Sequence, residues 1–143
     1  MIVAEIMQTN LLCCSPDTTV YEAARLMSER GVGACVVVSG QHLEGMFSER
    51  DVVRAVAGGH DVQACSVGEA MPRQAVAAPP DADLLWAADT MRRHGVRHLP
   101  VTEGGMVAGV VSLRDLFAAV EAMLRLDPRG AASARELLAA ARG

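Results

Sequence analysis

The sequence GMFSERD at residues 45–51 returns as GVVSLRD at residues 109–115, so that a Gly, a Ser, an Arg and an Asp recur at the same spacing. The similarity extends well beyond these two segments. Residues 3–56 align with residues 67–120 without a gap, and 18 of the 54 aligned positions are identical. Self-similarity at one fixed offset is typical of a duplicated structural unit. We therefore infer two copies of one unit, offset by 64 residues.

Each copy begins with the same predicted strand, turn and helix. A short apolar segment, residues 11–14 or 75–78, precedes a Pro-Asp turn. The apolar residues of the following segment keep helical spacing, and a glycine stands where a left-handed C-cap is expected. Thr and Asp are preferred N-cap residues. The predicted caps are the pair Thr18-Thr19 and Asp83 at the N-termini, and Gly31 and Gly95 at the C-termini.

Two strands and a second helix complete each copy. The strands are expected at residues 34–38 and 43–47, and again at 99–102 and 106–111, with polar hairpin loops between them. The second helices are expected to begin near Ser48 and Ser112. The sequence therefore predicts an α+β fold with the element order β-α-β-β-α, twice.

Two breaks in the pattern divide the chain. The segment GGHD at residues 58–61 separates the copies, and the similarity between them ends near residue 121. An Ala-rich segment at residues 131–142 is expected to form an additional C-terminal helix. We accordingly predict a first repeat at 1–59, a second repeat at 60–123 and a helical tail at 124–143.

The composition argues against several classes of function. A net charge of −4 offers no basic surface for a nucleic-acid backbone, and 3% aromatic residues leave few side chains to stack on bases. The N-terminal MIVAE lacks the basic start of a secretory signal, and no apolar run is long enough for a membrane span. We therefore expect a cytoplasmic chain that binds neither nucleic acid nor membranes.

The residues that could hold a metal are weakly placed. Cys13, Cys14, Cys35 and Cys65 form no Cys-x-x-Cys pair, which favours buried apolar thiols in a reducing compartment over a metal or redox site. His94 and His98 are four residues apart, but Gly95 ends the helix between them, which argues against zinc. We expect no metal site. Trp86 is expected to pack or to contact a second subunit.

Two β-α-β-β-α repeats that each close with Gly-φ-φ-Ser-x-x-Asp (φ, apolar) resemble the CBS domain pair, or Bateman module, a family named after cystathionine β-synthase. The string RHLPV at residues 97–101 also matches the family, and the resemblance spans about residues 3–121. It implies two repeats packed about a pseudo-twofold axis, two clefts between them, and a homodimer. It further implies AMP, ADP, ATP or S-adenosylmethionine as a regulatory ligand, with no obligatory cofactor.

The Ser-x-x-Asp motif has two interpretations. An ionised carboxylate can accept from both hydroxyls of a ribose, while a helix start and a nearby arginine suit the adjacent phosphate. The same spacing also forms a capping box, with Ser as N-cap and Asp as the third residue of the helix, which needs no ligand. With the family resemblance, ribose binding is favoured for Asp115. For Asp51 the two interpretations stay open.

The resemblance implies that each cleft takes residues from both repeats. The stronger site is expected to consist of Thr18, Val32, Ala34, Arg97, Ser112, Arg114 and Asp115. The weaker site is expected to consist of Gly33, Ser48, Arg50, Asp51, Ala82, Val96 and His98. The ranking follows from Ala82, which lacks the hydroxyl of Thr18, and from His98, which is bulkier than Ala34.

The favoured function is therefore that of a stand-alone regulatory module. It would bind an adenosine-containing nucleotide between its repeats and signal to an effector protein in trans. The alternative is a structural dimerisation or interaction module whose nucleotide sites are vestigial. An enzyme ranks third, because the sequence shows no nucleophile–base pair, metal cluster or glycine-rich phosphate loop.

Overall fold

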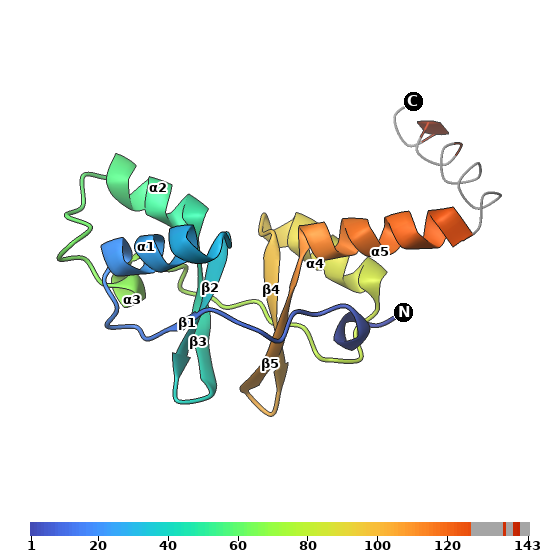
Figure 1. Cartoon of the computed structure of the whole chain (residues 1–143), viewed down its shortest axis with the longest axis horizontal. Helices are drawn as coiled ribbons and strands as arrows, with labels where there is room; N and C mark the ends of the chain where they lie inside the picture. Colours follow the sequence, from blue (N-terminus) through green and yellow to red (C-terminus); the bar gives the residue numbers. More distant parts are fainter. Residues whose placement is uncertain (127–135, 137–138, 141–143) are drawn as a thin grey trace.

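The computed structural model of the chain describes residues 1–126, 136, 139 and 140. Most of the helix expected at residues 131–142 lies outside the described residues. The fold is the predicted α+β arrangement, built on a mixed sheet of five strands. Figure 1 shows the two copies side by side, each with its own β-hairpin and pair of long helices.

The first copy forms all of the predicted elements. They are β1 (Cys13–Cys14), α1 (Val20–Arg30), β2 (Ala34–Ser39), β3 (His42–Ser48) and α2 (Glu49–Ala57). Thr19 caps α1 by accepting from the N–H of Glu22, and Gly31 ends it with a left-handed φ of 64°. These caps confirm the predicted start and end of the helix, because both satisfy backbone groups that a helix end leaves unpaired.

The second copy repeats this order with one element shortened. Its elements are α4 (Leu84–His94), β4 (His98–Glu103), β5 (Met106–Ser112) and α5 (Leu113–Leu126). The strand expected at residues 75–78 is reduced to a bridge between Ala78 and Val101. In the first copy, the N–H of Val36 donates to the carbonyl of Leu12 at 2.9 Å. Pro100 aligns with Val36 and has no N–H, so this bond has no counterpart and the strand is lost.

The beginning of each copy packs on the other copy. The 3-10 helix η1 (Val3–Glu5) lies on the second repeat, where the N–H of Val3 donates to the carbonyl of Ala82 at 2.8 Å. In return, α3 (Val67–Ala70) lies on the first repeat, where the N–H of Val67 donates to the carbonyl of Thr18 at 2.7 Å. The sequence boundaries at residues 59 and 60 stay a prediction, and the packing adds that neither repeat is complete without the other.

This exchange completes two hydrophobic cores. Val3 is fully buried in the core of the second repeat, and Val67 is fully buried in the core of the first. The aligned methionines Met7 and Met71 also pack against the other repeat. A Cβ at Gly45 would lie 2.9 Å from Sδ of Met71, and a Cβ at Gly109 would lie 2.5 Å from Sδ of Met7. Both glycines are therefore needed for close approach of a methionine from the other copy.

The two hairpins join only near their tips. The strand order is β1-β2-β3-β5-β4, and β3 meets β5 at one pair, His42 with Met106. Backbone N–H groups of Leu43 and Val107 donate across this junction, each at 3.1 Å. The other ends of the strands, which carry the two Ser-x-x-Asp motifs, are not paired with each other. This leaves them available to line the space between the repeats.

Candidate functional site

Two cavities lie where the unpaired strand ends of the repeats face each other. The larger measures about 750 Å³ and contains Asp115, and the smaller measures about 300 Å³ and contains Asp51. Ligand pockets in proteins range from about 300 to 1,000 Å³, so both are of usable size. The cavities have a wall in common, formed by Gly33, Ala34, Met46, Glu49, Arg97 and His98.

The larger cavity brings together all but one of the residues predicted for the stronger site. These are Val32, Ala34, Arg97, Ser112, Arg114 and Asp115. Leu11, Leu12 and Val36 add an apolar wall from the first repeat. One side of the cavity is therefore apolar, and its charged groups are the carboxylates of Asp115 and Glu49 and the guanidinium groups of Arg97 and Arg114. Arg114 forms no hydrogen bond or ion pair with any residue that the structure describes.

The Asp115 carboxylate serves the helix and the cavity at the same time. Its Oδ2 accepts from the backbone N–H and the hydroxyl of Ser112, at 2.7 and 2.9 Å, and Ser112 Oγ accepts from the Asp115 N–H at 3.1 Å. This is a reciprocal capping box. The other oxygen, Oδ1, accepts from Nε2 of Gln8 at 3.2 Å. Half of the carboxylate is thus committed to the helix, and the other half faces the cavity.

The start of α5 is less open to an anion than the sequence suggests. The N–H of Leu113 donates to the carbonyl of Arg97 at 2.8 Å, and the N–H of Asp115 is bound by Ser112 Oγ. Two of the first three backbone donors of the helix are therefore already satisfied. An anionic group in this cavity would have to be held mainly by the side chains of Arg97 and Arg114.

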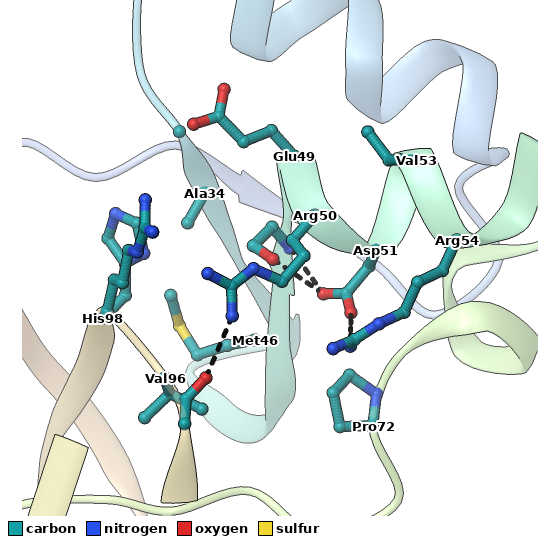
Figure 2. Close-up of a pocket in the computed structure, with 14 residues that line it drawn as sticks. Ala34, Met46, Glu49, Arg50, Asp51, Val53, Arg54, Pro72, Val96 and His98 are labelled. Atoms are coloured by element: carbon teal, nitrogen blue, oxygen red, sulfur yellow. Dashed lines mark hydrogen bonds and ion pairs between the residues drawn. The ribbon is translucent and has the colours of Figure 1, made fainter. Parts of the chain in front are cut away.

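Charged side chains of the smaller cavity contact other groups of the protein (Figure 2). Asp51 is 5% exposed, and its Oδ2 accepts from the N–H and hydroxyl of Ser48 at 2.8 and 3.0 Å. Its Oδ1 accepts from Arg54 at 3.3 Å. Arg50 reaches across the cavity and donates to the carbonyl of Gly95 at 3.3 Å. Both oxygens of Asp51 and the guanidinium of Arg50 therefore already have protein partners.

The structure places most residues predicted for the weaker site together. One residue predicted for each site, Thr18 or Ala82, lines neither cavity. Gly33, Ser48, Arg50, Asp51, Val96 and His98 line the smaller cavity. Ala82 does not, and Thr18 does not line the larger one. Thr18 Oγ1 instead accepts from the N–H of Ser15 at 3.1 Å, and the Thr18 carbonyl accepts from Val67. Thr18 lies in the turn that α3 covers, and Ala82 lies in the turn that η1 covers. The structure therefore does not support the expectation that either residue lines a cavity.

Sequence reasoning missed the segment that precedes the first strand of each copy. Gln8 lines the larger cavity, and Pro72, at the aligned position, lines the smaller one. Gln8 reaches the second repeat because it exchanges two backbone hydrogen bonds with Val110, at 2.8 and 3.0 Å. The alignment of Gln8 with Pro72 was visible in the sequence. Their position was not, because it depends on the exchange between repeats.

His98 lies in the wall that the two cavities have in common. A Cβ at Gly33 would lie 3.6 Å from Cε1 of His98 and 3.1 Å from Oε1 of Glu49, so both side chains pack against this glycine. Burial lowers the pKa of His98, and the positive charge of Arg97 lowers it further, while the carboxylates of Glu49 and Asp115 oppose the shift. The fold therefore favours the neutral imidazole at the point where the cavities adjoin.

This environment predicts a pH dependence of stability. The pKa of His98 is lower in the folded chain than in the unfolded chain, so protonation favours unfolding. The contribution of the neutral His98 to the free energy of unfolding is therefore fully present above the unfolded pKa of about 6.5 and is lost as the pH falls through the folded pKa. Urea unfolding at pH 8 and pH 5.5 should show a smaller loss of stability on acidification for His98→Gln than for the wild type. The exposed His60→Gln is the control, and equal losses in all three proteins would contradict the prediction.

Comparison with known proteins supports the assignment of both copies. The CBS domain model matches residues 3–58 and again residues 67–122. The chain belongs to the CBS domain family. It is 37% identical over 115 residues to the CBS domain-containing protein YhcV of Bacillus subtilis, covering 80% of this chain and 81% of YhcV. The CBS domain pair is therefore established over both repeats.

Solved structures of CBS proteins have the same fold. The CBS-domain containing protein ATU1752 from Agrobacterium tumefaciens is 31% identical, with a TM-score of 0.77 over 83% of this chain and 98% of its own. The CBS domain protein PAE2072 from Pyrobaculum aerophilum, solved in complex with AMP, is 26% identical, with a TM-score of 0.74 over 80% of this chain and 89% of its own. A CBS protein of this fold thus binds an adenine nucleotide.

Neither membrane-spanning helices nor metal-binding clusters occur in the described part of the chain. No helix there combines the length and the apolar character that crossing a bilayer requires. The same residues contain no group of three or more His, Cys, Asp or Glu side chains arranged to hold a metal ion.

Proposed function

We propose that this CBS pair binds an adenosine-containing nucleotide of the AMP, ADP or ATP type in the larger cavity and signals its occupancy to a partner protein. The observation that carries the proposal is the Asp115 carboxylate at the edge of a cavity of about 750 Å³, with an Oδ1 atom that the helix cap does not use and that accepts only from the exposed Gln8 among the described residues. Opposite it stand the apolar side chains of the first repeat. The module would be regulatory, and the proposal contains no catalytic step.

Each part of the cavity suits one part of such a ligand. A carboxylate oxygen has two lone pairs, and the 3.2 Å bond from Gln8 uses one of those on Asp115 Oδ1. Asp115 Oδ1 can therefore accept from one ribose hydroxyl as it stands, and from both adjacent hydroxyls once the ligand displaces Gln8. Arg97 and Arg114 suit the 5′ phosphate, because a guanidinium forms charge-assisted bonds with phosphate oxygens. The base would lie against Val32, Ala34 and Val36, which together form an apolar slot.

The different partners of the two carboxylates make the larger cavity the better site. A ribose there competes with Gln8, a neutral amide on an exposed side chain. In the smaller cavity it would compete with the guanidinium of Arg54, and hydrogen bonds to charged groups are stronger than neutral ones. The positions aligned with these two residues are Pro72 and Ala118, so neither competitor is repeated in the other cavity.

Thermal unfolding in the presence of nucleotides tests the proposal. A ligand at a hundred times its dissociation constant stabilises the folded chain by about 2.7 kcal/mol, and AMP, ADP, ATP and S-adenosylmethionine should be compared. The matched control ligand is 2′-deoxy-AMP, which lacks one hydroxyl of the diol and should bind more weakly than AMP. If no adenosyl compound raises the Tm, the module is structural and its nucleotide sites are vestigial.

We also propose that the module acts as a homodimer formed through α2 and α5. Val53 and Val56 of α2 are 66% and 60% exposed, and Phe117 and Val120 at the aligned positions of α5 are 70% and 46% exposed. Exposed apolar side chains at equivalent positions on two helices form a self-complementary surface suited to a twofold dimer.

Light scattering after gel filtration tests the dimer. The wild type should have twice the 15.0 kDa mass of the chain, and Phe117→Glu should shift the protein to the monomer mass. Met106→Glu is the control, because Met106 is 46% exposed but lies at the hairpin tip. A monomeric wild type, or a dimer that survives Phe117→Glu together with Val53→Glu, would contradict the proposed interface.

A further inference from the structure

Two of the four thiols meet in the core of the first repeat. Cys14, Cys35 and Cys65 are buried as the sequence predicts, whereas Cys13 is exposed. Sγ of Cys14 lies 3.2 Å from Sγ of Cys35, across 21 residues of chain. Both side chains belong to the same core cluster, on the face of the sheet that is covered by the helices. A disulfide would need the two sulfur atoms to approach to about 2.05 Å.

Strand geometry shows what this approach would require. β1 pairs with β2 in parallel so that Cys14 is opposite Val37, and Cys35 lies two residues earlier in β2 on the same face. The two residues are thus diagonal and not directly opposite, and their sulfur atoms still have to close from 3.2 Å to about 2.05 Å. β1 would therefore have to move along β2. It consists of two residues at the edge of the sheet, so only one neighbouring strand restrains it.

We propose that Cys14 and Cys35 are a redox-sensitive pair that closes reversibly to a disulfide and thereby displaces β1. The oxidant class is a hydroperoxide. The Cys14 thiolate attacks one peroxide oxygen and becomes a sulfenic acid as the O–O bond breaks and hydroxide leaves. The Cys35 sulfur then attacks the Cys14 sulfur, the S–O bond breaks, and water leaves with the Cys35 proton. The departing hydroxide takes up the proton that Cys14 gave up when it ionised. Two thiols lose two electrons, and hydrogen peroxide is reduced to two molecules of water, whereas an organic hydroperoxide would give one alcohol and one water.

The surroundings divide these roles between the two thiols. Cys14 is 8% exposed and Cys35 is 1% exposed, so a small peroxide reaches Cys14 more easily. A hydrogen bond from the Cys35 thiol lowers the pKa of Cys14, while the same bond and burial raise the pKa of Cys35. Cys14 is therefore the thiol that ionises first, and Cys35 is the one that resolves the sulfenic acid.

The pair is connected to the larger cavity on both sides. Asn10, Leu11 and Leu12 lead directly into β1 and line the cavity, as do Gly33 and Ala34 at the start of β2. A shift of β1 toward Cys35 changes the spacing between these two walls. A strained disulfide is also more easily reduced, which suits a reversible switch rather than a permanent crosslink.

The test oxidises the reduced full-length chain with a slight excess of hydrogen peroxide. Two of the four thiols should be lost, the mass should fall by two hydrogens, and a peptide joining Cys14 to Cys35 should appear and be cleaved by dithiothreitol. Cys14→Ala and Cys35→Ala should each abolish this crosslink. Cys13→Ala and Cys65→Ala are the matched controls and should retain it. Four surviving thiols, or a crosslink that involves Cys13 or Cys65 instead, would overturn the proposal.

The displacement of β1 has a readout that needs no ligand. In amide NMR spectra of the reduced and oxidised chain, the signals of Asn10, Leu11 and Gly33 should shift, whereas those of the aligned Gln74 and Ala75 should not. Unchanged signals around a formed disulfide would refute the switch. An AMP titration of both forms is expected to show several-fold weaker binding after oxidation, and this arm alone rests on the proposed function. If the reduced chain does not bind AMP, the proposed function fails while the thiol and NMR results still decide the switch.

Discussion

Asp115→Asn is expected to weaken AMP binding by more than about a hundredfold. The substitution puts an NH2 group at the Oδ1 position and removes both hydrogen bonds to the ribose diol. A hydrogen bond to a charged group contributes about 1.5–3 kcal/mol, so the loss of each is at least tenfold in affinity. Asparagine retains a side-chain oxygen that can still accept from the N–H of Ser112, so α5 keeps its cap. Isothermal titration with AMP, accompanied by a melting curve of the free protein, measures both effects.

Asp51→Asn is the matched control, because Asp51 forms the same contacts with Ser48. It should leave AMP affinity within about twofold of the wild type, since the ligand is expected at Asp115 and not at Asp51. A larger loss for Asp51→Asn would reverse the ranking of the cavities. Equal, large losses would show that both cavities bind the nucleotide. A wild-type affinity for both variants would show that neither carboxylate holds the ribose, and would contradict the proposed role of Asp115.

The architecture could be predicted from the sequence because it depends on local signals. The N-cap Thr19, the left-handed Gly31 and Gly95 and the start of α2 at Ser48 each leave a mark within a few residues. The same holds for the Ser-x-x-Asp motif. Of its two interpretations, the capping box is confirmed, because one oxygen of Asp115 accepts from the N–H of Ser112. The binding site stays a prediction, which the cap does not exclude because it leaves Oδ1 to Gln8.

The parts that could not be predicted depend on contacts between the copies. Thr18 was expected in the cavity and Gln8 was not, although both lie near the first strand. The difference arises because η1 crosses to the second repeat and takes Gln8 with it, while α3 covers the turn that contains Thr18. No periodicity or cap records this exchange. The loss of the strand at 75–78 could be predicted only in part. Pro100 is visible in the sequence, but its missing backbone N–H weakens that strand only because the segment pairs with β4, which the sequence does not show.

The packing of the N-terminal segment on the second repeat leads to the second large prediction. Gly109→Val is expected to lower the free energy of unfolding by about 3–5 kcal/mol. A Cβ at this position would lie 2.5 Å from Sδ of Met7 and 2.9 Å from the carbonyl oxygen of Gln8. Backbone cannot move aside as a flexible side chain can, so the N-terminal segment must leave the second repeat. Val3, which is fully buried, and Met7, which is partly buried, then become exposed. Full burial of one such side chain is worth about 1.5–3 kcal/mol, and the partial burial of Met7 adds a fraction of this.

Gly45→Val provides the comparison, because it places the same side chain at the aligned position. The atoms within 4 Å of a Cβ at Gly45 all belong to the flexible side chain of Met71, the nearest at 2.9 Å, and no backbone atom is among them. Met71 can change rotamer, so we expect a loss of only about 1 kcal/mol. Urea unfolding of both variants measures the difference. Equal losses of unfolding free energy in the two variants would mean that Gly109→Val does not detach the N-terminal segment from the second repeat. The prediction that packing of this segment stabilises the second repeat would then be wrong.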